Sequence, residues 1–458
     1  MAEPRIIIIG AGPAGVRAAE TLVKAGLAPL VLDENARDGG QIYRRPPEGF
    51  RRPATELYGT EAGRAEALHT TFDRLRGNID YRPRHLVWNI ADNHAHTVHD
   101  GISEAHPYDA LLIASGATDR LMPVKGWHRA GAYSLGAAQI ALKAQALAIG
   151  RRVVFMGSGP LLYLVAHQYA KAGAEVAAVL DTAPFSAQVR ALPLLLARPD
   201  VMAKGAALLL GLTRLGIPVH RGITPVEITG EDETGVTGVT IRLASGETRH
   251  IDADAVGLGW HLRPETQLAD LAGCAFTFEP LTRQFFPEID PDGRSTVPSV
   301  YLAGDGARTL GADGAEIAGK LAALAVLGDL GRPVSAETVA GLRRQRARME
   351  RFRQGLAQAF PWPAGLAAAL PDEAILCRCE AIRAGEVREV ATTKGAGEIN
   401  RAKALSRVGM GRCQGRYCGH AAAEVIAKAA NMSIDSVGRL RGQAPVKPVS
   451  IATVKGAS

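Results

Sequence analysis

The sequence of 458 residues predicts an α/β protein with two nucleotide-binding folds and a small C-terminal domain that carries cysteine ligands. Three observations predict it. A glycine-rich turn follows an apolar strand at residues 5–9, a second glycine turn follows another at 152–156, and four of the five cysteines form two close pairs after residue 376. Glycine lets backbone approach phosphate, and thiolates bind metal, so the pattern indicates a nucleotide and a metal centre in one chain.

The first segment is typical of a βαβ unit. The strand at 5–9 leads through Gly10-x-Gly12-x-x-Gly15 into a helix that reaches Lys24, and a second strand ends at Asp33. The glycines permit the tight turn, the approach of backbone to a pyrophosphate, and close packing of the helix on the strand. We expect Asp33 to bind the ribose hydroxyls of a purine dinucleotide. The Gly39-Gly40-Gln41 run that follows fits the same site.

The second βαβ unit matches a nucleotide site less well. Its strand at 152–156 leads through Gly157-Ser158-Gly159 into a helix, and the next strand ends at Asp181. Leu162 stands where the third glycine belongs, and bulky Tyr163 follows it, so the helix should lie farther from the strand. The sequence favours a retained scaffold fold here, and NAD(P) binding stays open as the alternative. Neither unit contains a Cys-x-x-Cys pair for disulfide reductase chemistry.

Two further turns favour a flavin at the first site. Ala114-Ser115-Gly116 ends a strand at 110–113, and Gly304-Asp305 ends a strand that begins at Val300. This arrangement resembles the superfamily of two-dinucleotide flavoproteins with Rossmann folds of the glutathione and thioredoxin reductase type. The resemblance implies that Asp305 contacts the ribityl or pyrophosphate region of FAD, where a carboxylate would satisfy hydroxyl donors removed from water. A helix N-cap is the other interpretation of Asp305.

The elements suggest a domain order in which the first nucleotide fold is interrupted by the second. The expected domains are the first part of the FAD-binding domain at 1–120, a second, NAD-like nucleotide fold at 121–247, the second part of the FAD-binding domain at 248–330, a helical connector at 331–370, a cluster domain at 371–442, and a tail at 443–458 that we expect to be extended or loosely ordered.

The cysteine pairs, Cys377-x-Cys379 and Cys413-x4-Cys418, predict the four ligands of a [2Fe-2S] cluster. Structural zinc is less favoured because zinc sites usually place two to four residues within a pair. A disulfide is the weakest alternative, since the rest of this long chain holds only Cys274, which we interpret as a small buried apolar residue.

Composition excludes several other classes. The net charge of +7 is modest for this length, and no long basic block alternates with aromatic residues, so nucleic-acid binding is not supported. No export leader precedes the first strand and no apolar run is long enough to span a membrane, so we expect a cytoplasmic protein. No acid/base constellation is evident, and the catalytic residues stay unknown. His261 is the most plausible polar group near a flavin ring, but a core or surface histidine is the favoured interpretation.

Three motifs carry a more specific resemblance: Gly10-Ala11-Gly12-Pro13-Ala14-Gly15, Gly39-Gly40-Gln41-Ile42-Tyr43-Arg44-Arg45, and Cys377-Arg378-Cys379-Glu380 with residues 409–419. The chain resembles the α subunits of bacterial heteromeric opine oxidases of the octopine and nopaline oxidase type. It is similar as well to the flavoprotein subunit of hydrogen cyanide synthase and to α subunits of dye-linked proline and hydroxyproline dehydrogenases. Its C-terminal part looks like a [2Fe-2S] domain of the bacterioferritin-associated ferredoxin (BFD) type.

The resemblance implies an oxidoreductase acting on CH–NH groups, in which this chain handles electrons. A D-amino-acid-oxidase-like β subunit with its own FAD would oxidise the opine, whose imine hydrolyses to an amino acid and a 2-oxo acid. A small γ subunit, FMN at the interface between subunits, and a quinone or other acceptor also belong to this pattern, as does peripheral attachment to a membrane. Some family members hold ATP in place of FAD. The alternatives are a self-contained NAD(P)H-dependent reductase and a non-redox scaffold subunit.

The cofactor contacts that we expect are Gly10, Gly12, Pro13, Ala14, Gly15, Asp33, Glu34, Gly40, Gln41, Arg45, Ala114, Ser115, Gly116, Gly304 and Asp305, and the expected metal ligands are Cys377, Cys379, Cys413 and Cys418.

Overall fold

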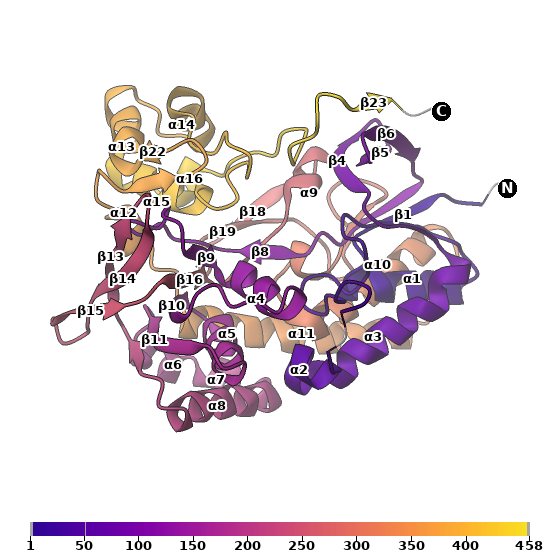
Figure 1. Cartoon of the computed structure of the whole chain (residues 1–458). Helices are drawn as coiled ribbons and strands as arrows, with labels where there is room; N and C mark the ends of the chain where they lie inside the picture. Colours follow the sequence, from indigo (N-terminus) through magenta and orange to yellow (C-terminus); the bar gives the residue numbers. More distant parts are fainter. Residues whose placement is uncertain (1–2, 51, 456–458) are drawn as a thin grey trace.

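The computed structural model describes residues 3–50 and 52–455, and its centre is formed by two parallel five-stranded sheets (Figure 1). The first sheet has the order β20-β7-β1-β2-β3. Its middle strand is a run of four isoleucines, which is typical of a parallel strand covered on both faces. The strands are β1 (Ile6–Ile9), β2 (Leu30–Leu32), β3 (Asp80–Arg82), β7 (Ala110–Ile113) and β20 (Val300–Leu302).

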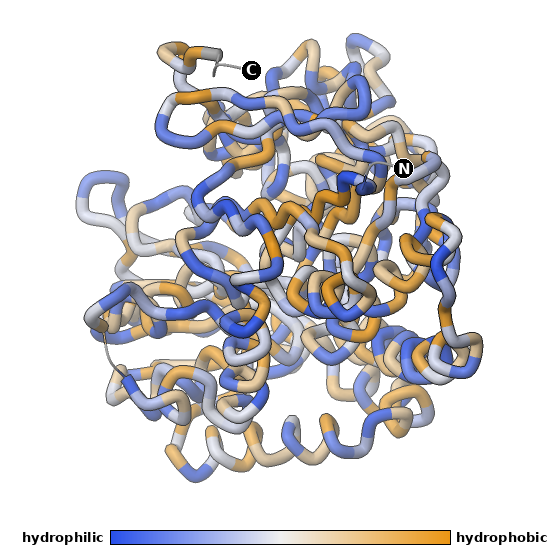
Figure 2. Tube along the Cα trace, turned by 90° about the vertical axis from the view of Figure 1, so that its right-hand side faces the viewer, coloured by the Kyte–Doolittle hydropathy of each residue, from blue (hydrophilic) through white to orange (hydrophobic). Residues whose placement is uncertain are grey.

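The two faces of the first sheet are covered by different elements. Ile6 and Ile8 belong to the core beneath the helices, whereas Ile7 and Ile9 face a second core beside a small four-stranded sheet. In Figure 2 apolar residues concentrate in the interior of the trace. The covering helices are α1 (Pro13–Lys24), α2 (Ala54–Tyr58), α3 (Ala62–Leu75) and α10 (Gly311–Asp329), with 3₁₀ turns η1 (Gly59–Glu61) and η2 (Arg76–Asn78); the small sheet is β4 (Leu86–Ala91), β5 (His94–His99), β6 (Ile102–Pro107) and β23 (Val454–Lys455).

The second sheet has the order β12-β11-β10-β16-β9. The boundary that we predicted after residue 247 is wrong, because β16 pairs in parallel with β10 in the middle of this sheet. The second fold therefore extends to Trp260. Its elements are β9 (Ala132–Ser134), α4 (Leu135–Ala144), β10 (Arg152–Ser158), α5 (Pro160–Lys171), β11 (Glu175–Asp181), α6 (Phe185–Arg190), α7 (Leu192–Leu195), α8 (Pro199–Arg214), β12 (Val219–Arg221) and β16 (Ala255–Trp260), with an antiparallel sheet of β13 (Thr224–Glu231), β14 (Gly235–Arg242) and β15 (Thr248–Asp252).

Short elements join the two folds to the C-terminal domain. The long helix α11 begins after Ser335, whose side chain accepts a hydrogen bond from the Thr338 amide, and ends before Phe360, where prolines follow. The connecting elements are β8 (Ala117–Asp119), β17 (Leu262–Pro264), α9 (Gln267–Leu271), β18 (Phe276–Glu279), β19 (Gln284–Pro287), η3 (Gly304–Gly306), α11 (Ala336–Ala359) and α12 (Ala364–Ala368).

The cysteine domain packs on the second nucleotide fold and shares its core. Trp127 of that fold is buried and donates a 2.6 Å hydrogen bond to the carbonyl of Ile375. One hydrophobic cluster runs from Trp260 through Trp362 into the cysteine domain. The domain consists of β21 (Ile375–Cys377), β22 (Ile382–Arg383), α13 (Ala384–Thr393), α14 (Ile399–Ser406), α15 (Gly419–Ala429) and α16 (Ile434–Val437).

The C-terminal tail is extended, as expected, but it is not loosely attached. It returns to the first nucleotide fold, where Val446 is buried and its amide donates a 3.1 Å hydrogen bond to the carbonyl of Trp88. The last strand, β23, pairs in parallel with β6 (Figure 1). The buried apolar contact explains the difference from our prediction, and residues 456–458 lie outside the described part of the chain.

Candidate functional site

The first glycine turn is too crowded for any larger residue. Gly10 has φ +101°, and a Cβ added there would collide with the carbonyl of Ala114. A Cβ on Gly15 would collide with the carbonyl of Gly10. Helix α1 begins immediately afterwards at Pro13, so the amides of its first turn lack intrahelical acceptors. The turn therefore presents free donors at the carboxyl edge of the sheet, the usual place for a phosphate.

The other predicted loops meet at this turn. Gly40 lies against Gly12, since a Cβ on Gly12 would come within 3.6 Å of the Gly40 Cα. Gly304 lies against Ala14, with 2.8 Å between an added Cβ and that methyl group. Gln41 is exposed beside them. The fold thus brings the glycine fingerprint, the 39–41 run and the Gly304 turn together, as the sequence predicts.

Arg45 is occupied within the chain. Its guanidinium lies 3.1 Å from a carboxylate oxygen of buried Asp38 and 3.0 Å from Asp73, and it donates a 2.9 Å hydrogen bond to the carbonyl of His69. These contacts tie the loop that carries Gly40 and Gln41 to α3. Arg45 therefore fixes this loop, and the direct cofactor contact that we expected of it stays a prediction.

Asp33 also points inward. It is 5% exposed, and its carboxylate accepts hydrogen bonds from the amides of Ala11 at 2.6 Å and Asn35 at 2.7 Å. Burial raises its pKa. Asp33 thus stabilises the glycine turn, and the ribose contact that we expected of it stays a prediction. Glu34 is the exposed carboxylate at the end of β2, and it forms an ion pair with Lys447 of the tail.

Asp305 anchors the start of α10, which is one of the two roles that the sequence left open. Its Oδ1 accepts hydrogen bonds from the amides of Leu310 at 2.8 Å and Gly311 at 3.0 Å, where α10 begins. Its Oδ2 accepts none from the described residues. Burial raises the pKa of Asp305 to about 6. One oxygen therefore anchors the helix start, and the other stays available for a donor outside the chain.

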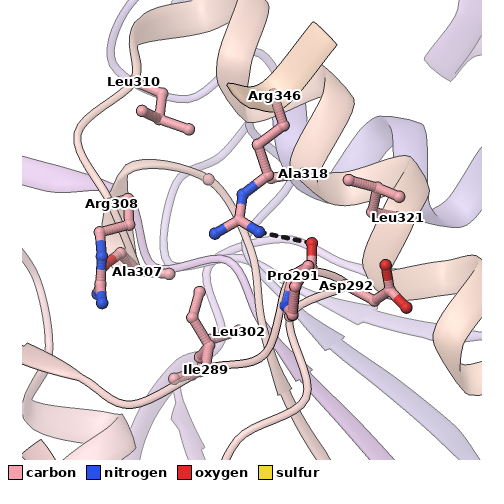
Figure 3. Close-up of a pocket in the computed structure, with 12 residues that line it drawn as sticks. Ile289, Pro291, Asp292, Leu302, Ala307, Arg308, Leu310, Ala318, Leu321 and Arg346 are labelled. Carbon is pink, nitrogen blue, oxygen red and sulfur yellow. Dashed lines mark hydrogen bonds between the residues drawn. The ribbon is translucent and has the colours of Figure 1, made fainter. Parts of the chain in front are cut away.

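Two hollows flank this region. A cavity of about 10 Å³ lies behind the Gly304 turn, and Figure 3 shows the Arg346 guanidinium reaching toward its middle, with Arg308 at its edge. Arg346 donates a 2.5 Å hydrogen bond to the carbonyl of Pro291. This volume suits one water molecule and no organic ligand. A cleft of about 650 Å³ lies between α10 and α8, and Arg17, Arg64 and Arg198 on its walls are already paired with carboxylates.

The second glycine turn is closed by the chain's own side chains. Tyr163 donates a 2.5 Å hydrogen bond to Oδ2 of Asp181, and the amide of Ala183 donates to Oδ1. Asp181 is completely buried, and burial raises its pKa. The carboxylate that a nucleotide ribose would use is therefore already satisfied.

His261 covers the same turn. An added Cβ on Gly159 would come within 3.2 Å of its ring, and its Nε2 lies 2.7 Å from the carbonyl of Phe360. Burial lowers the pKa of His261 to about 4, so the ring is neutral. His261 is thus a core histidine of the second fold, as the favoured interpretation held. Arg221 lies next to Asp181 on the paired strand, a basic neighbour that the linear sequence did not reveal.

The four cysteines of the C-terminal domain lie close to one another, since each affects the ionisation of at least one other. Cys377 interacts with Cys418, Cys418 with Cys413, and Cys413 with Cys379. Hydrogen bonds from Cys418 and from backbone amides lower the pKa of Cys377 to about 6 and of Cys413 to about 5. Cys418, the shared donor, has its pKa raised. The fold therefore brings all four predicted ligands together, although they are separated by more than a helix in sequence.

The loops around these thiols are shaped by glycine. A Cβ on Gly411 would collide with Cys379, and the amides of Gly409 and Gly415 point at the sulfurs of Cys377 and Cys413. Across residues 3–50 and 52–455, no group of three or more His, Cys, Asp or Glu side chains is arranged to hold a metal ion as it stands. The thiols are adjacent, but their side chains do not form a ready-made ligand cage.

Several residues that position the site were missed in the sequence. Glu265 and Arg416 form an ion pair of 2.6 Å between the loop after β17 and the cysteine loop. Phe360 supplies the carbonyl that holds His261. Neither position belongs to a local motif, because each contact joins segments distant in sequence.

Comparison with known proteins decides the family. The sequence profile described as "Pyridine nucleotide-disulphide oxidoreductase" matches residues 4–324. This chain belongs to that family. A profile described as "Sarcosine oxidase A3 domain" matches residues 382–457, which include Cys413 and Cys418. Membership of the oxidoreductase family implies a flavin cofactor and an oxidoreductase function. Among the described residues, no helix is both long and apolar enough to cross a membrane.

Curated relatives narrow the family further. The opine oxidase A-type subunit of Rhizobium meliloti is 38% identical, with 98% of this chain and 86% of the relative aligned. The corresponding opine oxidase subunit of Agrobacterium tumefaciens is also 38% identical, with coverages of 98% and 90%. Hydrogen cyanide synthase subunit HcnB of Pseudomonas aeruginosa is 32% identical, with 97% of both chains covered. The resemblance to the α subunits of opine oxidases is therefore confirmed, and it implies a complex with other subunits.

Solved structures agree with this fold. L-proline dehydrogenase from P. horikoshii is similar with a TM-score of 0.68 at 19% identity, covering 99% of this chain and 79% of that one. Thioredoxin reductase from T. acidophilum gives a TM-score of 0.51 at 19% identity, covering 72% of this chain and 99% of that one.

Proposed function

We propose that this chain is the electron-transferring subunit of a heteromeric flavin-dependent oxidase that acts on an opine or a related amino or imino acid. In this proposal a nucleotide occupies the first glycine turn and a [2Fe-2S] cluster occupies the four cysteines. The observation that carries it is a contrast between the two glycine turns. Beside the first, Oδ2 of Asp305 accepts no hydrogen bond from the described residues, whereas at the second Asp181 is satisfied by Tyr163 and Gly159 is covered by His261. Electrons would therefore come from a partner protein and not from NAD(P)H.

FAD fits the first site in several respects. The crowded turn at Gly10 and Gly15 leaves room for backbone alone, and the free amides of α1 suit a diphosphate. The unpaired Oδ2 of Asp305 would accept from a ribityl hydroxyl. Glu34, the exposed carboxylate, is the better placed of the two acidic residues for an adenine ribose. ATP shares the diphosphate and ribose, so it is the alternative ligand of this turn.

A [2Fe-2S] cluster fits the cysteine site by donor type. Four thiols make sulfur contacts, and amide N–H groups point at two of them, as at thiolates that bind iron. Zinc would accept the same donors, but Cys-x-Cys is a tight spacing for it.

The two sites would have different roles in electron transfer. When bound, flavin accepts electron pairs and an iron–sulfur cluster passes electrons singly, so together they connect hydride chemistry to a one-electron carrier. This chain's residues hold both groups in place. The relatives are named as opine oxidase subunits, which supports C–N oxidation on a D-amino-acid-oxidase-like β subunit. A small γ subunit, interface FMN, a quinone acceptor and a cytoplasmic location belong to the same proposal.

Co-purification tests this function directly. The chain would be expressed with the products of its neighbouring genes, purified without oxygen, and analysed for flavin, adenine nucleotide, iron and acid-labile sulfide. The complex would then be screened against opines and imino acids with an artificial dye as acceptor. We expect equal amounts of iron and sulfide and dye reduction by an opine. Zinc in place of iron, or a complex without dye reduction by any such substrate, would contradict the proposal.

A further inference from the structure

We propose that Glu265 and Arg416 form a positioning pair that couples the flavin-binding loop to the cluster-binding loop and sets the reduction potential of the cluster. The inference rests on the proposed function, and it names residues that the glycine and cysteine motifs do not contain. Its basis is a chain of hydrogen bonds that runs without interruption from Ser115 to Cys413.

The first half of this chain attaches the backbone of Glu265 to the flavin loop. The Ser115 hydroxyl donates a 2.6 Å hydrogen bond to the Glu265 carbonyl, and the Glu265 amide donates a 2.9 Å hydrogen bond to the carbonyl of Gly116. The pairing of β8 with β17 extends this attachment. Ser115 also borders the Asp305 turn, because a Cβ on Gly306 would lie 2.7 Å from its hydroxyl. Glu265 is therefore fixed to the loops where the flavin ring is expected.

The second half attaches the side chain of Glu265 to the cysteine loop. Arg416 Nε lies 2.6 Å from one carboxylate oxygen, and its Nη2 lies 3.1 Å from the other, a two-pronged contact that fixes orientation as well as distance. The remaining Nη1 donates to the carbonyls of Cys413 at 3.2 Å and Val446 at 2.8 Å. Arg416 stands between Cys413 and Cys418 in sequence. The Arg416 guanidinium thus contacts three segments: the loop that carries Cys413, the loop that carries Glu265, and the C-terminal tail at Val446.

The charges around the pair give it an electrostatic role. Arg263 lies 3.6 Å from the Glu265 carboxylate, and the Glu265 and Arg416 side chains are only 12% and 8% exposed. Burial opposes ionisation of Glu265, yet the charges of Arg263 and Arg416 lower its pKa. Arg263 and Arg416 outnumber the single anion Glu265, and Lys447 adds a further positive charge that acts on it, so the surroundings of the pair are net positive. A buried positive charge stabilises the reduced form of a cluster, so each member of the pair should shift the potential in its own direction.

Two neutralising variants separate this role from simple structural support. In Arg416→Gln the cluster loses a positive neighbour, so its midpoint potential should fall. In Glu265→Gln it loses a negative neighbour of similar shape, so its potential should rise. We expect each shift to change the reduction equilibrium about tenfold, which is 59 mV for one electron. The readout is a redox titration of the anaerobic complex followed by electron paramagnetic resonance. A merely structural role would move both variants in the same direction or neither.

The matched control is a second ion pair that also joins the cysteine domain to the rest of the chain. Arg283 forms a two-pronged ion pair with Glu424 of α15, and neither residue bonds to the flavin loop or to a cysteine. Arg283→Gln should leave the potential unchanged. If Arg416→Gln fails to fold, Arg416→Lys retains the charge and loses the two-pronged contact. That variant should keep the wild-type potential and slow flavin-to-cluster electron transfer after a reducing pulse.

The outcomes distinguish the two levels of the proposal. Potentials of both Gln variants that match the Arg283→Gln control would overturn the positioning pair while the electron-transfer function stands. A wild-type complex without any iron–sulfur signal would overturn the proposed function itself. An unchanged transfer rate in Arg416→Lys would show that the geometry of the pair has no role.

Discussion

Tyr163 donates a 2.5 Å hydrogen bond to Asp181 in a fully buried environment, at the end of β11, where a working dinucleotide fold offers its carboxylate to a ribose. Breaking this bond would leave a buried acceptor unsatisfied, at a cost of roughly 1–3 kcal/mol. The neighbouring contact of His261 with Phe360 closes the glycine turn from the other side. The protein's own side chains therefore occupy the place where the second fold would bind a nucleotide.

This closure predicts that NADH and NADPH do not reduce the chain. Anaerobic mixing of the flavin-loaded protein with either nucleotide should leave the flavin absorbance unchanged, because neither ribose nor pyrophosphate finds a free partner at Asp181 or Gly159. Dithionite, which needs no binding site, should bleach the same sample and serves as the control. Rapid bleaching by NADH would favour a self-contained reductase.

Replacing Cys413 should separate the two cofactor sites. Cys413→Ser removes a thiol that contacts both Cys418 and Cys379, so iron content and the visible absorbance of a cluster should be lost. Nucleotide should stay bound, because the glycine turn lies in a different domain. The control is Cys274→Ser, at a buried cysteine that is not among the four. Loss of nucleotide together with iron in Cys413→Ser would argue against independent sites.

Substitutions at Asp305 should distinguish the roles of its two carboxylate oxygens. Asp305→Asn retains an Oδ1 acceptor for the Leu310 and Gly311 amides but replaces the free oxygen with a donor. Loss of one hydrogen bond to a charged group costs roughly 1.5–3 kcal/mol, so flavin should bind about tenfold to a hundredfold more weakly at pH 8.

Asp305→Ala tests the helix contact in addition. It should weaken flavin binding similarly and also destabilise the apoprotein by about 1 kcal/mol, because the start of α10 loses its acceptor. Flavin titration by fluorescence and denaturant unfolding of the apoprotein measure the two effects. Equal flavin affinity in the wild type and Asp305→Asn would remove the Oδ2 atom from the binding site.

His261 should make the protein sensitive to acid. Burial lowers its pKa in the folded chain to about 4, whereas the unfolded chain titrates near 6.5. Between these values the unfolded state binds the extra proton, so stability falls as pH drops through about 6.5 toward 4 and is unaffected above that window. At pH 5 the loss from this residue is about 2 kcal/mol.

The variant His261→Gln, which can still donate to the Phe360 carbonyl, should abolish that part of the loss. Urea unfolding at pH 8 and pH 5 measures it, with exposed His250→Gln as the control. If the wild type and His261→Gln lose the same stability between the two pH values, the ring is not held neutral as described.

The sequence predicted the structure best where contacts within a short segment determine which residue type can be present. Gly10 and Gly15 are required by collisions within one turn, so their motif predicted both the turn and the helix after it. The cysteine pairs likewise predicted that four thiols meet, because a shared ligand was the favoured explanation of that spacing. The scaffold character of the second fold followed from Leu162 and Tyr163, although the hydrogen bond to Asp181 was not foreseen.

Other features depend on contacts that no local pattern encodes. Asp33 and Glu34 are adjacent carboxylates, and only the position of the Ala11 amide decides that the first turns inward. The boundary at residue 247 was misplaced because strand β16 joins its sheet through pairing with β10, more than a hundred residues earlier. The attachment of the tail depends on buried Val446, on an ion pair of Lys447 and on the pairing of β23 with β6, none of which the local sequence indicates.

The pairing of β23 with β6 also constrains how the protein is made. During translation the partner strand at 102–107 leaves the ribosome long before residues 454–455. The edge of the small sheet at β6 must therefore stay unpaired until β23 has been synthesised.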